Sequence, residues 1–278
     1  MITGASGYVG GRLVERAATE LDVHALWRST EPPAGARAHR VDLDDVATLQ
    51  ATFSATRPEV VVHAAYDMAA GAEPNLRWTR NVMSAANLVG ARLLFLSSDM
   101  VFDGTRGWYR EADEPRPLTA YGVWKAQLER EVLAAGGVVA RTALVWGLAP
   151  VSDNVAKLVL EPLKNGRAPR LFEDEWRTPT EVHDLACGLL EACGLRGPRI
   201  LHLAGPERLS RLELGRMLAR HHGYDPTRVP PFRRAEIAPD RPRDVSLVME
   251  TTREVVSTRF RGPSEILSSG GAAKEPQR

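Results

Sequence analysis

The first half of the chain alternates short apolar runs with longer amphipathic stretches. The apolar runs cover residues 23–27, 60–63, 93–96 and 138–145, and a shorter run, residues 1–3, stands at the start. The stretches between them repeat their apolar positions with helical spacing and cover residues 8–21, 46–56, 79–89 and 120–135. Buried strands that alternate with helices predict an α/β fold, a Rossmann-type doubly wound parallel sheet with right-handed crossovers.

The pattern changes after Gly147. We expect helices over residues 153–165, 182–193 and 211–221, a strand over 200–204, and irregular structure in the polar strip 167–180 and the Pro- and Arg-rich segment 225–243. We therefore divide the chain into a sheet domain (1–146), a mixed region (147–267) that forms a small interleaved lobe and returns to the sheet, and a disordered tail (268–278). The first strand is short for a central one, so we expect residues before Met1 in the natural protein.

Composition excludes several classes of protein. The 36 basic and 35 acidic residues leave a net charge of +1, without the basic surplus of a nucleic-acid binder. The two cysteines, Cys187 and Cys193, share a predicted helix, where a disulfide is geometrically poor and no metal-ligand spacing surrounds them. Apolar runs fall short of the ~20 residues of a membrane helix, and no charged leader precedes Gly4. We expect a cytoplasmic protein with two reduced, buried thiols, without a metal or a membrane anchor.

A glycine-rich loop joins the first predicted strand to the first helix. Gly4 allows the tight turn, Gly7 lets the backbone approach a pyrophosphate, and Gly10 lets the helix pack against the strand. The helix N-terminus then presents free N–H groups to phosphates. This context predicts dinucleotide binding rather than a turn chosen only for packing. The predicted contacts are Gly4, Ser6, Gly7, Tyr8, Val9 and Gly10.

The end of the second strand indicates which dinucleotide binds. An NAD-specific site would place an acidic residue there, whereas this chain has Arg28 and Ser29, which suit a 2′-phosphate. We therefore favour NADP(H) over NAD(H), with a solvated Arg28 as the alternative. Asp42 and Leu43, after the third strand, are expected near the adenine.

Tyr121 and Lys125 are four residues apart at a predicted helix start, and therefore share one face. An ammonium near a phenol lowers the pKa of the phenol, and we expect Lys125 to bring Tyr121 toward a useful range. Ser98 ends an apolar strand and is suited to polarise a substrate oxygen. The order of glycine loop, Ser-ending strand and Tyr-x-x-x-Lys pair favours catalysis over surface packing.

Several segments together resemble a known family. Residues 96–104 read Leu-Ser-Ser-Asp-Met-Val-Phe-Asp-Gly, and the Tyr-Gly-x-x-Lys segment at 121–125, Arg-Thr-Pro-Thr at 177–180 and Arg-Pro-Arg-Asp at 241–244 follow in order. The chain resembles the extended short-chain dehydrogenase/reductase superfamily and, more narrowly, the dTDP-4-dehydrorhamnose reductase family of sugar-nucleotide reductases. The resemblance extends from Ile2 to about Phe260.

The resemblance implies roles for individual residues. Ser98, Tyr121 and Lys125 would be catalytic, with Tyr121 as the proton donor. Further cofactor contacts would come from Ala64, Ala65, Tyr66 and Asn81. Substrate contacts would come from Asp99, Met100, Leu144, Trp146, Arg177, Arg241 and Arg243, with the last two on the substrate's phosphates or simply solvated. Leu144 stands where the family has a tryptophan facing the sugar, and Met100 where it has a tyrosine.

These observations predict an NADP(H)-dependent reductase that acts on a carbonyl, a keto group of a nucleotide-linked sugar. One alternative is an NAD-dependent nucleotide-sugar epimerase or dehydratase, against which Arg28 argues. Another is a non-catalytic NADP(H)-binding protein resembling the regulatory subunit of methionine adenosyltransferase. Helices at the edge of such sheets often pair, so a homodimer is considered alongside a monomer.

Overall fold

The computed structural model describes residues 1–148 and 155–269. Its centre is a parallel sheet of seven strands in the order β11-β6-β5-β4-β1-β2-β3. The strands are β1 (Ile2–Thr3), β2 (His24–Trp27), β3 (Arg37–Arg40), β4 (Val60–His63), β5 (Arg92–Ser98), β6 (Val138–Thr142) and β11 (Arg199–Leu203). The predicted doubly wound parallel sheet is confirmed. Strand order reverses between β1 and β4, which opens a crevice at the carboxyl ends of these strands.

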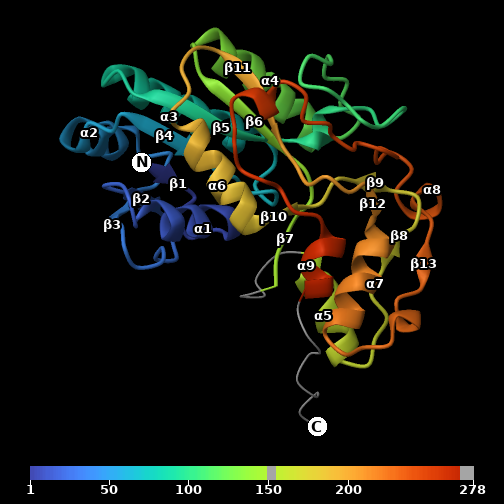
Figure 1. Ribbon diagram of the computed structural model, residues 1–278. Helices are drawn as coiled ribbons and strands as arrows, with labels where there is room; N and C mark the ends of the chain where they lie inside the picture. Colours follow the sequence, from blue (N-terminus) through green and yellow to red (C-terminus); the bar gives the residue numbers. More distant parts are fainter. Residues whose placement is uncertain (149–154, 270–278) are drawn as a thin grey trace.

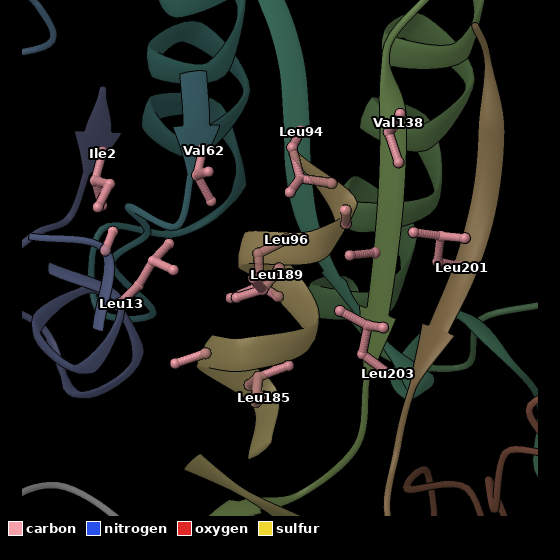
Figure 2. Close-up of a cluster of buried hydrophobic side chains, with 14 of the residues drawn as sticks. Ile2, Leu13, Val62, Leu94, Leu96, Val138, Leu185, Leu189, Leu201 and Leu203 are labelled. Atoms are coloured by element: carbon pink, nitrogen blue, oxygen red, sulfur yellow. The ribbon is translucent and has the colours of Figure 1, made fainter. Parts of the chain in front are cut away.

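Helices cover both faces of the sheet (Figure 1). One face carries α1 (Tyr8–Ala17) and α6 (Val182–Ala192), and the other carries α2 (Val46–Thr56), α3 (Ala72–Leu88) and α4 (Ala120–Ala134). Alternate residues of the inner strands feed the two cores. Figure 2 shows the first core, where Leu94 and Leu96 of β5 meet Leu185 and Leu189 of α6. The opposite core takes Leu93 and Phe95 from the same strand. Because β4 and β5 are buried on both faces, these strands are almost continuously apolar.

A smaller lobe packs beside the carboxyl ends of the strands (Figure 1). Its strands are β7 (Val145–Trp146), β8 (Leu171–Phe172), β9 (Trp176–Arg177), β10 (Thr180–Glu181), β12 (Leu209–Ser210) and β13 (Pro231–Phe232). Its helices are α5 (Val155–Lys164), α7 (Arg211–His221), α8 (Arg234–Ile237) and α9 (Pro263–Ser269). Short 3₁₀ turns are η1 (Asp99–Val101), η2 (Pro226–Arg228) and η3 (Thr252–Glu254). α5 and α7 share a core of their own, and a capping box between Ser210 and Glu213 starts α7.

Several elements differ from the sequence prediction. The helix expected over residues 8–21 ends at Ala17, and the strip 167–180, expected to be irregular, contains the short strands β8, β9 and β10. The expected strand 138–145 is two strands, because the chain leaves the sheet after Thr142 and β7 pairs with β10 instead. α3 begins at Ala72 rather than Thr79, since Pro74 lies in the first turn, where its missing N–H breaks no helical bond. Ser268 belongs to α9 rather than to a tail, and the remainder of the predicted tail, 270–278, lies outside the described residues.

Two features of the fold bear on the predictions for the cysteines and for a membrane span. Cys187 and Cys193 are free thiols, as predicted, but both are only partly buried. Over residues 1–148 and 155–269, none of the helices is long and apolar enough to cross a bilayer.

Candidate active site

A cavity of about 1410 Å³ opens where the parallel strands end. This exceeds the ~300–1,000 Å³ typical of small-molecule sites, so it has room for a dinucleotide and a second molecule. Most residues predicted for cofactor, reaction and substrate line it: Gly4, Ser6, Gly7, Tyr8, Val9, Gly10, Arg28, Ser29, Asp42, Leu43, Ala64, Ala65, Tyr66, Ser98, Met100, Tyr121, Lys125, Leu144, Arg177 and Arg241. Four predicted residues do not line it: Asn81, Asp99, Trp146 and Arg243.

The glycine loop forms one end of this cavity. Gly4 has φ +66°, and a Cβ there would lie 2.7 Å from the Ala65 backbone. A Cβ on Gly10 would lie 2.1 Å from the Gly4 carbonyl oxygen. Gly7 is the N-cap residue of α1 and has no side chain to cap the helix, and the first turn of the helix has no acidic residue. A close-packed backbone turn at the start of a helix, without an acidic side chain, fits the pyrophosphate of a dinucleotide.

The side chains expected around the adenosine end lie after β2 and β3. The exposed Arg28 guanidinium is 5.7 Å from the Trp78 ring centroid and 3.8 Å from the Asp67 carboxylate. Trp78 lines the cavity and was not identified from the sequence, because its position in the middle of α3 carries no motif. Asn81 does not contact the cofactor cavity, although the family resemblance predicts that it would. Its amide donates to the Leu43 carbonyl oxygen at 2.8 Å, so it holds the loop after β3 and does not line the cavity.

The three residues predicted for the reaction lie together at the middle of the cavity. Ser98 ends β5, and Tyr121 is in the first turn of α4, which Thr119 caps by accepting from the Gly122 amide at 3.1 Å. A Cβ on Gly122 would lie 2.1 Å from the Met100 carbonyl oxygen. This close packing sets the start of α4 against the turn after Ser98, and Tyr121 hydrogen-bonds to Ser98.

Lys125 is enclosed by aromatic rings. Its side chain is 3% exposed, and its Nζ donates to the Leu96 carbonyl oxygen at 2.7 Å. The Nζ lies 4.5 Å from the ring centroid of Phe95 and 4.9 Å from that of Trp124. Burial lowers the pKa of Lys125 to about 7, against the opposing charge of Glu129. The lysine can therefore change its charge near neutral pH.

The expected lowering of the Tyr121 pKa is wrong. Burial raises the pKa of Tyr121 further above its usual value, and the hydrogen bond to Ser98 only partly opposes this. Lys125 Nζ is 6.0 Å from the Tyr121 ring centroid and is held by Leu96. Tyr121 consequently keeps its proton at neutral pH, which is the state that a proton donor requires.

Three arginines, Arg177, Arg211 and Arg241, line the other end of the cavity and are joined by buried carboxylates behind them. Asp99 is fully buried, and its carboxylate takes a bidentate ion pair from Arg177. Arg177 also contacts the fully buried Glu175 at 3.3 Å. Glu175 accepts from Arg211 at 3.1 Å and from Arg241 at 2.8 Å. Burial opposes the ionisation of Glu175, but the hydrogen bond of Arg241 and the three arginine charges outweigh it and lower its pKa to about 2.

This arrangement corrects the predictions for Asp99 and Trp146 and places Arg243 in the solvated position that was its alternative. Asp99 is closed off by Arg177, so it positions that arginine instead of facing the cavity. Trp146 is fully buried in the core between α5 and α7. Arg243 is exposed and stacks on Trp176, 5.2 Å from the ring centroid. Conversely, Arg211 and Thr142 line the cavity and were not identified from the sequence. A hydroxyl residue at a strand end, as at Ser98, was the available signal for Thr142.

Comparisons with known proteins cover nearly the whole chain. A family model described as the RmlD substrate binding domain matches residues 1–264. The dTDP-4-dehydrorhamnose reductase of Mycobacterium tuberculosis is 34% identical over 266 residues, which are 87% of this chain and 82% of that protein. Methionine adenosyltransferase 2 subunit beta of Xenopus laevis is 31% identical over 237 residues, 79% of this chain and 70% of that protein.

The fold also matches a solved structure. The crystal structure of a hypothetical dTDP-4-dehydrorhamnose reductase from Sulfolobus tokodaii aligns with a TM-score of 0.81 and 28% sequence identity, covering 94% of this chain and 95% of that one. The similarity therefore includes both the sheet and the smaller lobe.

Proposed function

The chain belongs to the family of the RmlD substrate binding domain, and from this we propose that it is an NADP(H)-dependent reductase of a keto group on a nucleotide-linked sugar. The observation that carries the proposal is the shared cavity. Ser98, Tyr121 and Lys125 line the same space as the glycine loop at one end and Arg241 at the other.

The glycine loop and Arg28 support NADP(H) as the cofactor. A Cβ at Gly4 or Gly10 would overlap backbone atoms, so the sequence keeps a close-packed turn at a helix N-terminus, which suits a pyrophosphate. Arg28 and Ser29 replace the acidic residue that would bind an unphosphorylated ribose. NADPH bound here would supply the hydride for carbonyl reduction.

The residues at the middle of the cavity would handle the proton. Tyr121 is protonated at neutral pH because burial raises its pKa, and it would donate to the alkoxide that develops as the carbonyl is reduced. Ser98 holds the phenol in place through its hydrogen bond. Lys125, with a pKa of about 7, would add positive charge beside the developing oxyanion when protonated.

The arginines of the smaller lobe support an anionic substrate. Arg177, Arg211 and Arg241 share Glu175, and Asp99 balances Arg177, so three cations meet two carboxylates and leave one positive charge. Arg211 and Arg241 both line the cavity. A surplus cation facing a cavity suits a phosphate group, as a nucleotide-linked sugar would provide.

A second candidate is a non-catalytic NADP(H)-binding regulatory subunit. It is favoured by the 31% identity to the protein named methionine adenosyltransferase 2 subunit beta. Ser98, Tyr121 and Lys125 are all present and face the cavity, which supports the enzyme over this candidate.

The two candidates differ in a direct assay. A panel of keto-sugar nucleotides, each mixed with the protein and NADPH, should contain at least one compound that drives NADPH oxidation, followed by its absorbance. NADPH binding without oxidation across the panel, together with co-purification of a synthetase-like partner, would favour the regulatory subunit instead.

A further inference from the structure

Thr142 carries a buried hydroxyl at the cavity wall. The side chain is 6% exposed, and its Oγ1 has no hydrogen-bond partner among residues 1–148 and 155–269. Thr142 nevertheless lines the large cavity. Buried polar groups are normally hydrogen-bonded, so an unpaired hydroxyl at a cavity wall calls for a ligand.

The strand register places Thr142 beside Ser98. β5 and β6 pair in parallel, with Ser98 opposite Thr142 and Ser97 opposite Arg141. Paired residues of adjacent strands project from the same face, and neighbouring strands lie ~4.8 Å apart. Ser97 and Arg141 both contact Glu129 on the α4 face.

Ser98 and Thr142 accordingly continue the opposite face. Leu94, Leu96 and Val138 face α6 on that side, as Figure 2 shows. The apolar rows of β5 and β6 thus end in two hydroxyls side by side at the cavity.

Ser98 already makes hydrogen bonds within the protein, whereas the Thr142 hydroxyl makes none to the described residues. The Ser98 hydroxyl donates its one proton to Asp99 Oδ1 at 3.0 Å and accepts from the Met100 amide at 3.2 Å. A threonine hydroxyl offers one donor and two acceptor sites. Of the two hydroxyls, Thr142 is therefore the one with a free donor next to the reacting centre.

We infer that Thr142 binds an oxygen of the substrate next to the carbonyl that is reduced, a ring hydroxyl in the case of a sugar. This inference rests on the proposed function and adds a specificity residue to it. A wall that offers a free hydroxyl favours a hydroxylated carbon beside the keto group, because a deoxy carbon there would leave Thr142 unpaired.

The test uses Thr142→Val, which exchanges the hydroxyl for a methyl group of similar shape, and Thr142→Ser as the control that keeps the hydroxyl. The melting temperature of Thr142→Val without ligand should equal or exceed that of the wild type, because no hydrogen bond to the described residues is lost. Its KM for a keto-sugar nucleotide that the wild type reduces should rise at least tenfold, with unchanged NADPH affinity. Thr142→Ser should stay within about threefold of the wild type in both constants.

Several results would overturn the inference. A melting temperature of Thr142→Val several degrees below the wild type would show that the hydroxyl has a partner inside the protein. An unchanged KM would show that Thr142 does not contact the substrate, and the proposed reductase activity would still stand. A parallel loss of NADPH affinity would assign the hydroxyl to the cofactor. If the wild type reduces no keto-sugar nucleotide at all, the proposed function fails, and this inference falls with it.

Discussion

The two ends of the cavity position their side chains by different means. At the cofactor end, a short loop fixed by backbone packing does so, as where Gly10 packs on Gly4, six positions earlier. At the substrate end, ion pairs between distant residues do so: Asp99 and Arg177 are 78 positions apart, and Glu175 and Arg241 are 66 apart. The packing at the cofactor end joins residues close in the sequence, whereas the ion pairs at the substrate end join residues that only folding brings together. The predictions below separate these two means of positioning side chains.

The largest effect is expected at the centre of the substrate end. Replacing Glu175 with Ala leaves Arg177, Arg211 and Arg241 without their shared carboxylate, and breaking a buried ion pair in this way costs about 3–5 kcal/mol. Urea unfolding should show this loss. Glu173→Ala is the matched control, since Glu173 pairs at the surface with Arg233 and should lose less than about 1 kcal/mol. Equal losses in the two variants would contradict the account of Glu175.

At the cofactor end, Gly10→Ala should abolish NADPH binding. Its Cβ would lie 2.1 Å from the Gly4 carbonyl oxygen, so the loop must shift, and we expect a loss of stability of about 1–3 kcal/mol as well. Gly11→Ala is the control in the same helix, because its Cβ would meet Pro33 at an ordinary 3.4 Å. That variant should bind NADPH normally. Isothermal titration measures both affinities, and normal binding by Gly10→Ala would disprove the close packing.

Lys125 lies where the two ends meet, and its burial predicts a pH dependence. Its pKa is about 7 in the folded protein and ~10.4 in an unfolded chain. Between these values only the unfolded chain holds the proton, so the lysine's contribution to the free energy of unfolding rises with pH. The free energy of unfolding of the wild type, minus that of Lys125→Met, should rise by about 1–2 kcal/mol from pH 7 to 8.5. Urea unfolding at both pH values measures it, and a constant difference would contradict the lowered pKa.

The smallest effect is expected for Arg28→Ala. Loss of a guanidinium at the 2′-phosphate should weaken NADPH binding about tenfold, or ~1.4 kcal/mol, and leave NADH binding unchanged. Arg37→Ala on the neighbouring β3 is the control, since Arg37 pairs with Asp22 and does not line the cavity. An equal loss of affinity for NADH and NADPH would show that Arg28 does not bind the 2′-phosphate.

Much of the fold could be predicted from the sequence because its strands are buried on both faces and its helices are amphipathic. β4, α2 and α7 begin and end at the predicted residues. The break after Thr142 was missed, since residues 138–145 form one apolar run and only the pairing of β7 with β10 divides it.

Several residues of the site were predictable from the sequence, but their surroundings were not. Gly4, Gly10, Ser98, Tyr121 and Lys125 follow from spacing along the chain, and all line the cavity. The side-chain environments did not follow from spacing. The aromatic enclosure of Lys125, the closure of Asp99 by Arg177 and the burial of Trp146 arise from contacts between segments far apart in the sequence.

The role of Tyr121 as proton donor is tested most directly by Tyr121→Phe, assayed with NADPH and a keto-sugar nucleotide that the wild type reduces. The account predicts that turnover falls by about 10²–10⁴-fold, the usual contribution of a positioned acid. NADPH affinity should be unchanged, because the glycine loop and Arg28 are intact. Turnover equal to that of the wild type would contradict the assignment of the proton to Tyr121.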